Sequence, residues 1–176
     1  YKVYYDSLLV EVPNSLLKNI LIMKALIVRN KTLVTRELIE NAPNLKCVGR
    51  LGVGLDNIDL NACKEQNIAV YPALGANSHS VAEYVICTSM LLLRKAYFKK
   101  NEMIAGNWPR QESSGSEVYG KTLGFIGFGD IARKTRDLAI GLGINTVAYD
   151  PYLDKDSNVW KDTKNLDLDN LLSISD

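Results

Sequence analysis

The sequence predicts an α/β protein with two domains, each built around a doubly wound parallel sheet. Two observations lead to this prediction. Short apolar segments alternate with amphipathic helical segments in the first half, and the alternation begins again after the loop at 75–77. In the second half, a glycine-rich turn at Gly127 lies between a strand-like and a helix-like segment. Strands that alternate with helices at this spacing are typical of βαβ units and so of parallel sheets.

The first half is expected to contain three helices, each with a local start signal. Asn14 follows Pro13 and is expected to be an N-cap, because its side chain can accept a hydrogen bond from the first helical turn. Thr35 and Asp59 are expected to cap two further helices, and Pro43 ends the helix that Thr35 begins. The expected elements are a strand over 1–5, a helix over 15–21, a buried strand over 25–28, a helix over 35–41, a strand over 45–48, a helix over 59–66 and a strand over 69–71.

The second half is expected to begin with a long helix. Ser80 and Glu83 have the spacing of a capping box, and the segment 81–93 is apolar almost all round. A helix with this pattern is expected to be buried on more than one side. Residues 106–120 then form a polar connection. The remaining expected elements are a strand over 122–126, a helix over 131–142, a strand over 146–149 and a helix over 167–173.

Composition excludes several classes of function. Hydrophobic residues make up 47% of the 176 residues and charged residues 23%, which is typical of a globular protein. The net charge of +1 favours neither nucleic acid nor an anionic membrane as a partner. One histidine and three widely spaced cysteines indicate neither a metal site nor a disulfide framework. Free thiols of this kind indicate a cytoplasmic protein.

The turn at 127–132 has the pattern of a dinucleotide-binding loop. Gly127 permits a tight turn, and Gly129 leaves room for a diphosphate beside the backbone. Ala132 replaces the third glycine of the pattern and is small enough for the helix to pack against the strand. The backbone N–H groups of Asp130 and Ile131 open the helix, where the dipole favours an anion, while the Asp130 side chain is expected to point away. The sequence therefore predicts a Rossmann-like domain.

Asp150 completes this pattern. It ends the strand that follows the helix, 21 residues after Gly129, where an acidic residue binds the adenosine ribose. A carboxylate accepts hydrogen bonds from a ribose 2′-hydroxyl but repels a 2′-phosphate, by up to about 4 kcal/mol at 4 Å and an effective dielectric constant of 20. Solvent reduces this energy severalfold, and the sign still favours NAD over NADP.

With these motifs in place, the sequence resembles the D-isomer-specific 2-hydroxyacid dehydrogenases, and most of all their phosphoglycerate-type members. The resemblance runs in family order from about residue 25 to the end of the chain. It covers the segments 28–32, 48–59, 75–77 with 80–83, 120–129 and 149–151.

The resemblance implies a substrate site as well as a cofactor site. The Gly52-Val53-Gly54 turn is similar to the loop whose N–H groups hold the substrate carboxylate, and Val53 also matches the nicotinamide edge. Arg29 and Arg50 match positions that bind anionic groups of the substrate, a task that suits the planar guanidinium fork. Two further positions match the substrate-binding set: Asn77, and Arg110, which is expected to reach the site of a neighbouring subunit.

The resemblance also implies that both domains are incomplete here. A substrate-binding domain is expected over residues 1–77, without its first strand, and the N-terminal half of an NAD-binding domain over 78–176. The family's catalytic arginine, glutamate and histidine are expected beyond residue 176, so this chain alone is expected to be inactive. His79 matches no catalytic position. A homodimer is expected by analogy.

Three classes of function remain open at this point. The first is an NAD-dependent dehydrogenase of a small 2-hydroxyacid or 2-oxoacid, with 3-phosphoglycerate as the first substrate and 3-sulfolactate as the second; hydroxypyruvate, glyoxylate and D-lactate are further alternatives. The second is an NAD-sensing corepressor, a binding protein of similar fold. The third is a remnant that dimerises through the helix at 81–97.

Overall fold

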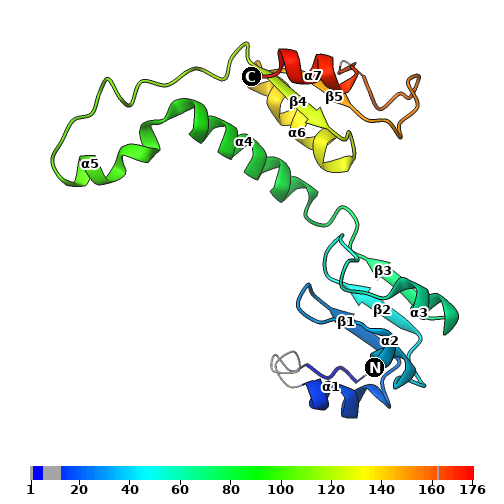
Figure 1. Cartoon of the computed structure of the whole chain (residues 1–176). Coiled ribbons are helices and arrows are strands. Elements are labelled where there is room, and N and C mark those ends of the chain that lie inside the picture. Colours follow the sequence, from blue (N-terminus) through cyan, green and yellow to red (C-terminus); the bar gives the residue numbers. More distant parts are fainter. Residues whose placement is uncertain (1, 6–12, 162) are drawn as a thin grey trace. The chain divides into compact units, whose positions relative to one another are not determined.

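The structure, a computed structural model, describes residues 2–5, 13–161 and 163–176 (Figure 1). The chain divides into two compact units, Tyr1–Ala76 and Asn77–Asp176. The boundary falls one residue before the expected one. Each unit contains a three-stranded parallel sheet, so the predicted α/β class with two parallel sheets is confirmed.

The first unit has the strand order β1-β2-β3. Leu26, Val48 and Val70 lie side by side in register, and Val48 is fully buried at the centre of the unit's apolar core. The strands alternate with helices, as a parallel sheet requires. The elements in chain order are α1 (Pro13–Ile20), β1 (Ala25–Val28), α2 (Arg36–Glu40), β2 (Cys47–Arg50), α3 (Leu60–Glu65) and β3 (Ala69–Pro72).

The second unit has the strand order β4-β5-β6. Its core contains Phe125, Phe128, Ala148 and Trp160, and the long helix α4 packs along α6 (Figure 1). The elements are α4 (Ser78–Arg94), the 3₁₀ helix η2 (Ala96–Lys99), α5 (Lys100–Ile104), β4 (Thr122–Ile126), α6 (Asp130–Gly141), β5 (Asn145–Tyr149), β6 (Lys164–Asn165) and α7 (Leu168–Ile174). The sequence patterns did not predict η2, α5 or β6.

Several helix starts agree with the sequence and others do not. Thr35 and Asp59 cap their helices, since their side chains accept from the N–H groups of Leu38 at 3.3 Å and Ala62 at 2.8 Å. The expected cap at Asn14 is wrong, because α1 begins at Pro13. Proline fits the first helical position because an N–H group there has no partner in the helix.

The expected capping box of α4 is also wrong. The helix begins at Ser78, two residues before Ser80, and its N-cap Asn77 makes no side-chain capping bond. The expected burial of this helix on more than one side is wrong for the described part of the chain, where only Ser78 and Ala82 of α4 are buried. Tyr84 and Leu92 are 70% and 61% exposed, since packing against α6 covers one side only.

Two strand predictions also need correction. The described residues 2–5 form no strand; Val3 and Tyr5 are 85% and 87% exposed, and no described strand pairs with them. The strand expected over 45–48 is β2, Cys47–Arg50, because its parallel register with β1 begins at Cys47. The buried strand expected over 25–28 is half-buried, with Leu26 and Val28 inside.

Two absences in the described part of the chain bear on function. No helix among them is both long and apolar enough to span a bilayer. No group of three or more metal-ligating side chains occurs among them either.

Candidate dinucleotide and substrate sites

The glycine turn between β4 and α6 has the shape that its sequence requires. Gly127 has a φ of +89°, a conformation that other residues adopt only under strain. Its N–H donates to the carbonyl of Tyr149 at 2.7 Å and so ties the turn to the end of β5. The turn therefore lies at the carboxyl ends of neighbouring parallel strands, where α/β proteins bind their ligands.

Gly129 is a glycine for a different reason. Its φ of −73° suits any residue, and a Cβ atom built there meets nothing within 4 Å. It is the N-cap of α6, and no described side chain caps the helix at this position. The space beside Gly129 at the start of α6 is thus open, and at such a helix start backbone N–H groups can approach an anion closely. These features fit the diphosphate of a dinucleotide.

Asp130 does not leave an unbalanced charge at this helix end. Its carboxylate forms an ion pair with Lys134, one turn along the exposed side of α6. Hydrogen bonds from Lys134, and then from Ser78, lower the pKa of the Asp130 carboxyl. Ile131 and Ala132 are half-buried, and Ala132 packs against the apolar core of the unit. Backbone binding by Asp130 and Ile131 remains a prediction.

Asp150 lies directly beside the glycine turn. Its Oδ2 atom accepts from the N–H of Phe128 at 2.8 Å, and its Oδ1 atom accepts from the N–H of Tyr152 at 2.9 Å. These two backbone groups, Phe128 first, lower the pKa of the Asp150 carboxyl. Each oxygen keeps a second lone pair, so the carboxylate can also accept from ribose hydroxyls.

The first unit places two arginines at one edge of its sheet. Arg50 is the last residue of β2 and pairs with Val28, the last residue of β1, and Arg29 follows Val28 directly. Both residues therefore lie at the carboxyl ends of adjacent strands. The structure thus brings together two of the predicted substrate-binding residues, and this edge is the usual ligand-binding edge.

Arg50 folds back over the turn that follows it. Its Nη1 atom donates to the Leu51 carbonyl at 3.0 Å, while its buried Nε has no partner among the described residues. A Cβ atom at Gly52 would overlap the guanidinium, and Gly52 has a φ of +153°. The positive φ favours glycine at this position, and a side chain there would displace the Arg50 guanidinium. Gly54 is exposed, and Val53 is 44% exposed on the same turn.

Asn57 supports this edge and was missed by the sequence patterns. It is 5% exposed, and its Nδ2 donates to the carbonyls of Arg29 at 2.9 Å and Thr32 at 2.7 Å. The amide therefore holds the turn that carries Arg29. An amide side chain directly before the hydrophobic Ile58, within the segment 48–59, was the available signal.

Replacing Asn57 with alanine is expected to destabilise the first unit by about 2 kcal/mol, because two carbonyls lose their donor in a buried place. Urea denaturation of the chain measures this change. Asn44→Ala is the matched control, since its Nδ2 also donates to a carbonyl, that of Leu21 at 2.8 Å, but at an exposed site. Equal effects of the two substitutions would contradict a specific supporting role for Asn57.

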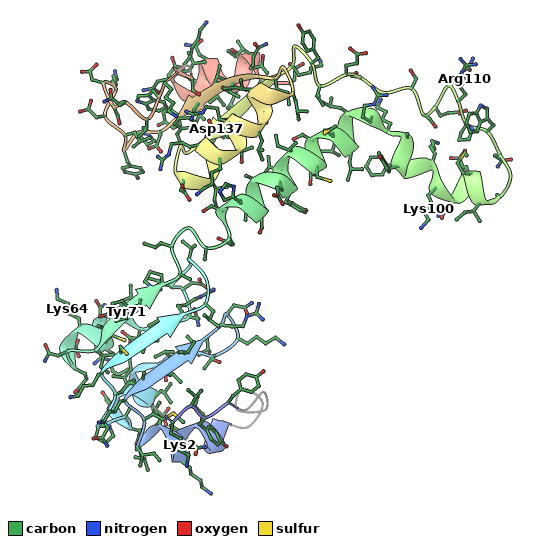
Figure 2. All side chains as sticks on the ribbon, turned by 180° about the vertical axis from the view of Figure 1, so that it is seen from behind. Lys2, Lys64, Tyr71, Lys100, Arg110 and Asp137 are labelled. Carbon is green, nitrogen blue, oxygen red and sulfur yellow. The ribbon has the colours of Figure 1, made fainter. Side chains whose placement is uncertain are left out.

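The remaining predicted site residues stand apart from these two groups. Asn77 is exposed at the start of α4, and His79 is exposed beside it. Figure 2 shows Arg110 on the connection between α5 and β4, where its side chain is exposed. Asn77 and Arg110 belong to the second unit and Val53 to the first. Their roles toward substrate or nicotinamide therefore stay predictions.

Comparison with known proteins identifies the class that these two units define. The sequence pattern of the D-isomer specific 2-hydroxyacid dehydrogenase catalytic domain matches residues 2–157. The chain belongs to this family, and the predicted family is confirmed.

Named relatives and solved structures agree with this assignment. The (S)-sulfolactate dehydrogenase of Chromohalobacter salexigens is 48% identical over 90% of this chain and 52% of its own length. The D-3-phosphoglycerate dehydrogenase of Archaeoglobus fulgidus is 39% identical over 87% of this chain and 29% of its own length. The chain thus spans about half, or less, of the length of these relatives. A formate dehydrogenase from Staphylococcus aureus, solved with NAD, covers 92% of this chain and 49% of its own at 32% identity, with a TM-score of 0.77.

Proposed function

We propose that the chain provides the dinucleotide-binding turn and part of the substrate site of an NAD-dependent 2-hydroxyacid dehydrogenase. One observation above all supports this function. The glycine turn of the second unit is joined to the ribose-type acid by the 2.8 Å hydrogen bond from the Phe128 N–H to Asp150, within the fold of this family.

A few groups of the second unit bind the cofactor in this proposal. Gly129 and the first N–H groups of α6 hold the diphosphate, and Asp150 accepts from the ribose hydroxyls. When bound, NAD accepts a hydride and NADH donates one. The catalytic arginine, glutamate and histidine of such an enzyme are proposed to lie in sequence beyond residue 176.

The substrate half favours a 2-hydroxyacid with a second anionic group. Arg29 and Arg50 lie at one sheet edge, and Arg50 keeps a buried donor without a described partner. Sulfonate and phosphate each present several oxygens to such groups. 3-Sulfolactate is the first candidate, because the relative that is 48% identical bears that name. 3-Phosphoglycerate is the second, supported by relatives at 39% and 41% identity.

We also propose a homodimer in the reducing cytoplasm. Exposed apolar side chains line α4 and η2, among them Tyr84, Leu92 and Tyr97 at 70%, 61% and 71% exposure. A second copy would cover these side chains, since contiguous exposed apolar side chains mark interaction surfaces. The three cysteines are free thiols. Light scattering on the purified protein measures the mass, and a monomer would contradict the dimer.

The substrate proposal is tested with the full-length gene product and NADH, by comparing 3-sulfopyruvate, 3-phosphohydroxypyruvate, hydroxypyruvate, glyoxylate and pyruvate. A 2-oxoacid with a second anionic group, 3-sulfopyruvate first and 3-phosphohydroxypyruvate second, is expected to have the highest kcat/KM. Arg50→Gln should reduce it roughly 10- to 100-fold, the loss of a charge-assisted contact. Lys64→Gln, on the exposed side of α3 (Figure 2), is the control. NADH binding without turnover of any 2-oxoacid would favour the corepressor-like class. No NADH binding would contradict both the dehydrogenase and the corepressor-like class.

Asp150→Asn is expected to raise the NADPH:NADH affinity ratio about tenfold, because a charge that repels the 2′-phosphate is removed from an otherwise similar side chain. The pKa of the Asp150 carboxyl is lowered in the folded protein, so the acid stays ionised above its unfolded value of about 4 and protonates only at still lower pH. The wild-type ratio should therefore be constant between about pH 7 and 8, where Asp150 stays ionised and the 2′-phosphate, whose second pKa is about 6, is mostly doubly charged. Titration by nicotinamide fluorescence measures the affinities for NADH and NADPH. A ratio that the substitution leaves unchanged would contradict a role for Asp150 in ribose binding.

A further inference from the structure

Phe128 is the residue through which several parts of the second unit meet. It lies between the two glycines of the turn and is fully buried. Its N–H donates to Asp150, and its carbonyl accepts from Arg133 Nη1 at 3.1 Å. The backbone of the proposed diphosphate loop and the ribose-type acid are therefore both held by one residue, whose position depends on what packs against its ring.

Trp160 stacks on that ring. The rings of Trp160 and Phe128 are stacked, with centroids 5.1 Å apart and an interplanar angle of 3°. Trp160 is 6% exposed. The guanidinium of buried Arg136 lies 5.6 Å from the centroid of the Phe128 ring and donates to the Val159 carbonyl at 3.2 Å, next to Trp160 in the chain.

Trp160 also closes the irregular segment that follows Asp150. Its indole Nε1 donates to the carbonyl of Asp154 at 2.8 Å, and Leu153 packs against the same core. The N–H of Tyr152 in this segment donates to Asp150. The Asp150 carboxylate is thus held by one N–H from the glycine turn and one from the 151–160 segment, and Trp160 contacts both parts.

We propose that Trp160 is a positioning residue of the dinucleotide site, which sets the glycine turn through Phe128 and the ribose-binding carboxylate through the 151–160 segment. This inference rests on the proposed NAD binding. It assigns to a residue outside the glycine pattern, and outside the ribose acid, a role in cofactor affinity. Aromatic stacking of this kind adds to simple burial and fixes the relative orientation of the two rings.

The test uses the full-length gene product and three single variants. Trp160→Phe keeps a stacking ring, Trp160→Leu keeps apolar volume without a flat ring, and Trp108→Phe is the matched control because Trp108 is 75% exposed. Thermal melts establish the temperature range in which each variant is folded. We expect Trp160→Leu to weaken NADH binding about tenfold and Trp160→Phe much less, in line with the strength of an aromatic pair. Trp108→Phe should bind as the wild type does.

A second measurement needs no cofactor. Hydrogen exchange of the Phe128 amide, bonded to Asp150 in the wild type, should be accelerated in folded Trp160→Leu and near normal in Trp160→Phe. Energy transfer from tryptophan to bound NADH should survive in Trp108→Phe and fall in Trp160→Phe, because Trp160 is stacked on Phe128 of the glycine turn. Wild-type NADH affinity and wild-type exchange at Phe128 in Trp160→Leu would overturn the inference. Failure of the wild type itself to bind NADH would instead overturn the proposed function, and the inference with it.

Discussion

Replacing Gly129 with serine is expected to lower NADH affinity at least about 100-fold, equivalent to about 2.7 kcal/mol, while the fold remains intact. Serine is a favourable N-cap residue, and a Cβ atom at this position meets nothing within 4 Å. The added side chain fills the space that a diphosphate needs, and its hydroxyl accepts from the N–H groups that would bind the anion. Nicotinamide fluorescence measures the affinity, and a thermal melt measures the fold.

Gly127→Ala is the control that separates the two glycines. The φ of +89° at Gly127 makes alanine strained there, at a cost of about 1–2 kcal/mol, so this variant should melt at a lower temperature. Gly129→Ser should melt at or above the wild-type temperature. If Gly129→Ser binds NADH with wild-type affinity, the turn is not the diphosphate site.

Phe128→Ala is expected to destabilise the second unit by about 3–5 kcal/mol, the usual cost of removing a fully buried phenylalanine ring. The substitution leaves a cavity between Phe125 and Trp160 and removes the ring beneath the buried Arg136 guanidinium. Urea denaturation followed by tryptophan fluorescence measures the loss, because Trp160 becomes exposed as this core opens.

Leu172→Ala is the control for this experiment. Leu172 is 57% exposed in α7, outside the proposed dimer face, and a surface substitution of this kind is expected to change stability by no more than about 0.5 kcal/mol. A loss below about 1 kcal/mol for Phe128→Ala would contradict the view that this ring is the main anchor of the glycine turn.

The features that the sequence predicts well are those that depend on neighbours in the chain. Thr35 and Asp59 cap their helices because the acceptor and the N–H group lie three residues apart. The Gly127 turn follows from the conformational freedom of glycine, and Asp150 follows from the regular length of a βαβ unit. The incorrect caps at Asn14 and Ser80 show the limit of such signals, since several nearby residues can begin a helix.

Features that depend on packing partners far away in the chain could not be predicted in this way. The exposure of Tyr84 and Leu92 on α4 depends on which elements cover that helix, and the apolar pattern alone predicted burial on more than one side. The position of β2 depends on its register with β1, which shifts the strand to Cys47–Arg50.

The sequence by itself determined the α/β class, the family, and the positions of the glycine turn, the ribose-type acid and the two arginines. Tertiary structure alone decided how these groups are supported. Asn57 holds the Arg29 turn, Arg50 lies over Gly52, and Trp160 stacks on Phe128. The physical reason is that a turn or a cap is set by bonds a few residues long. The support of a site is set instead by contacts between distant segments, which exist only once the sheet and its helices have packed together.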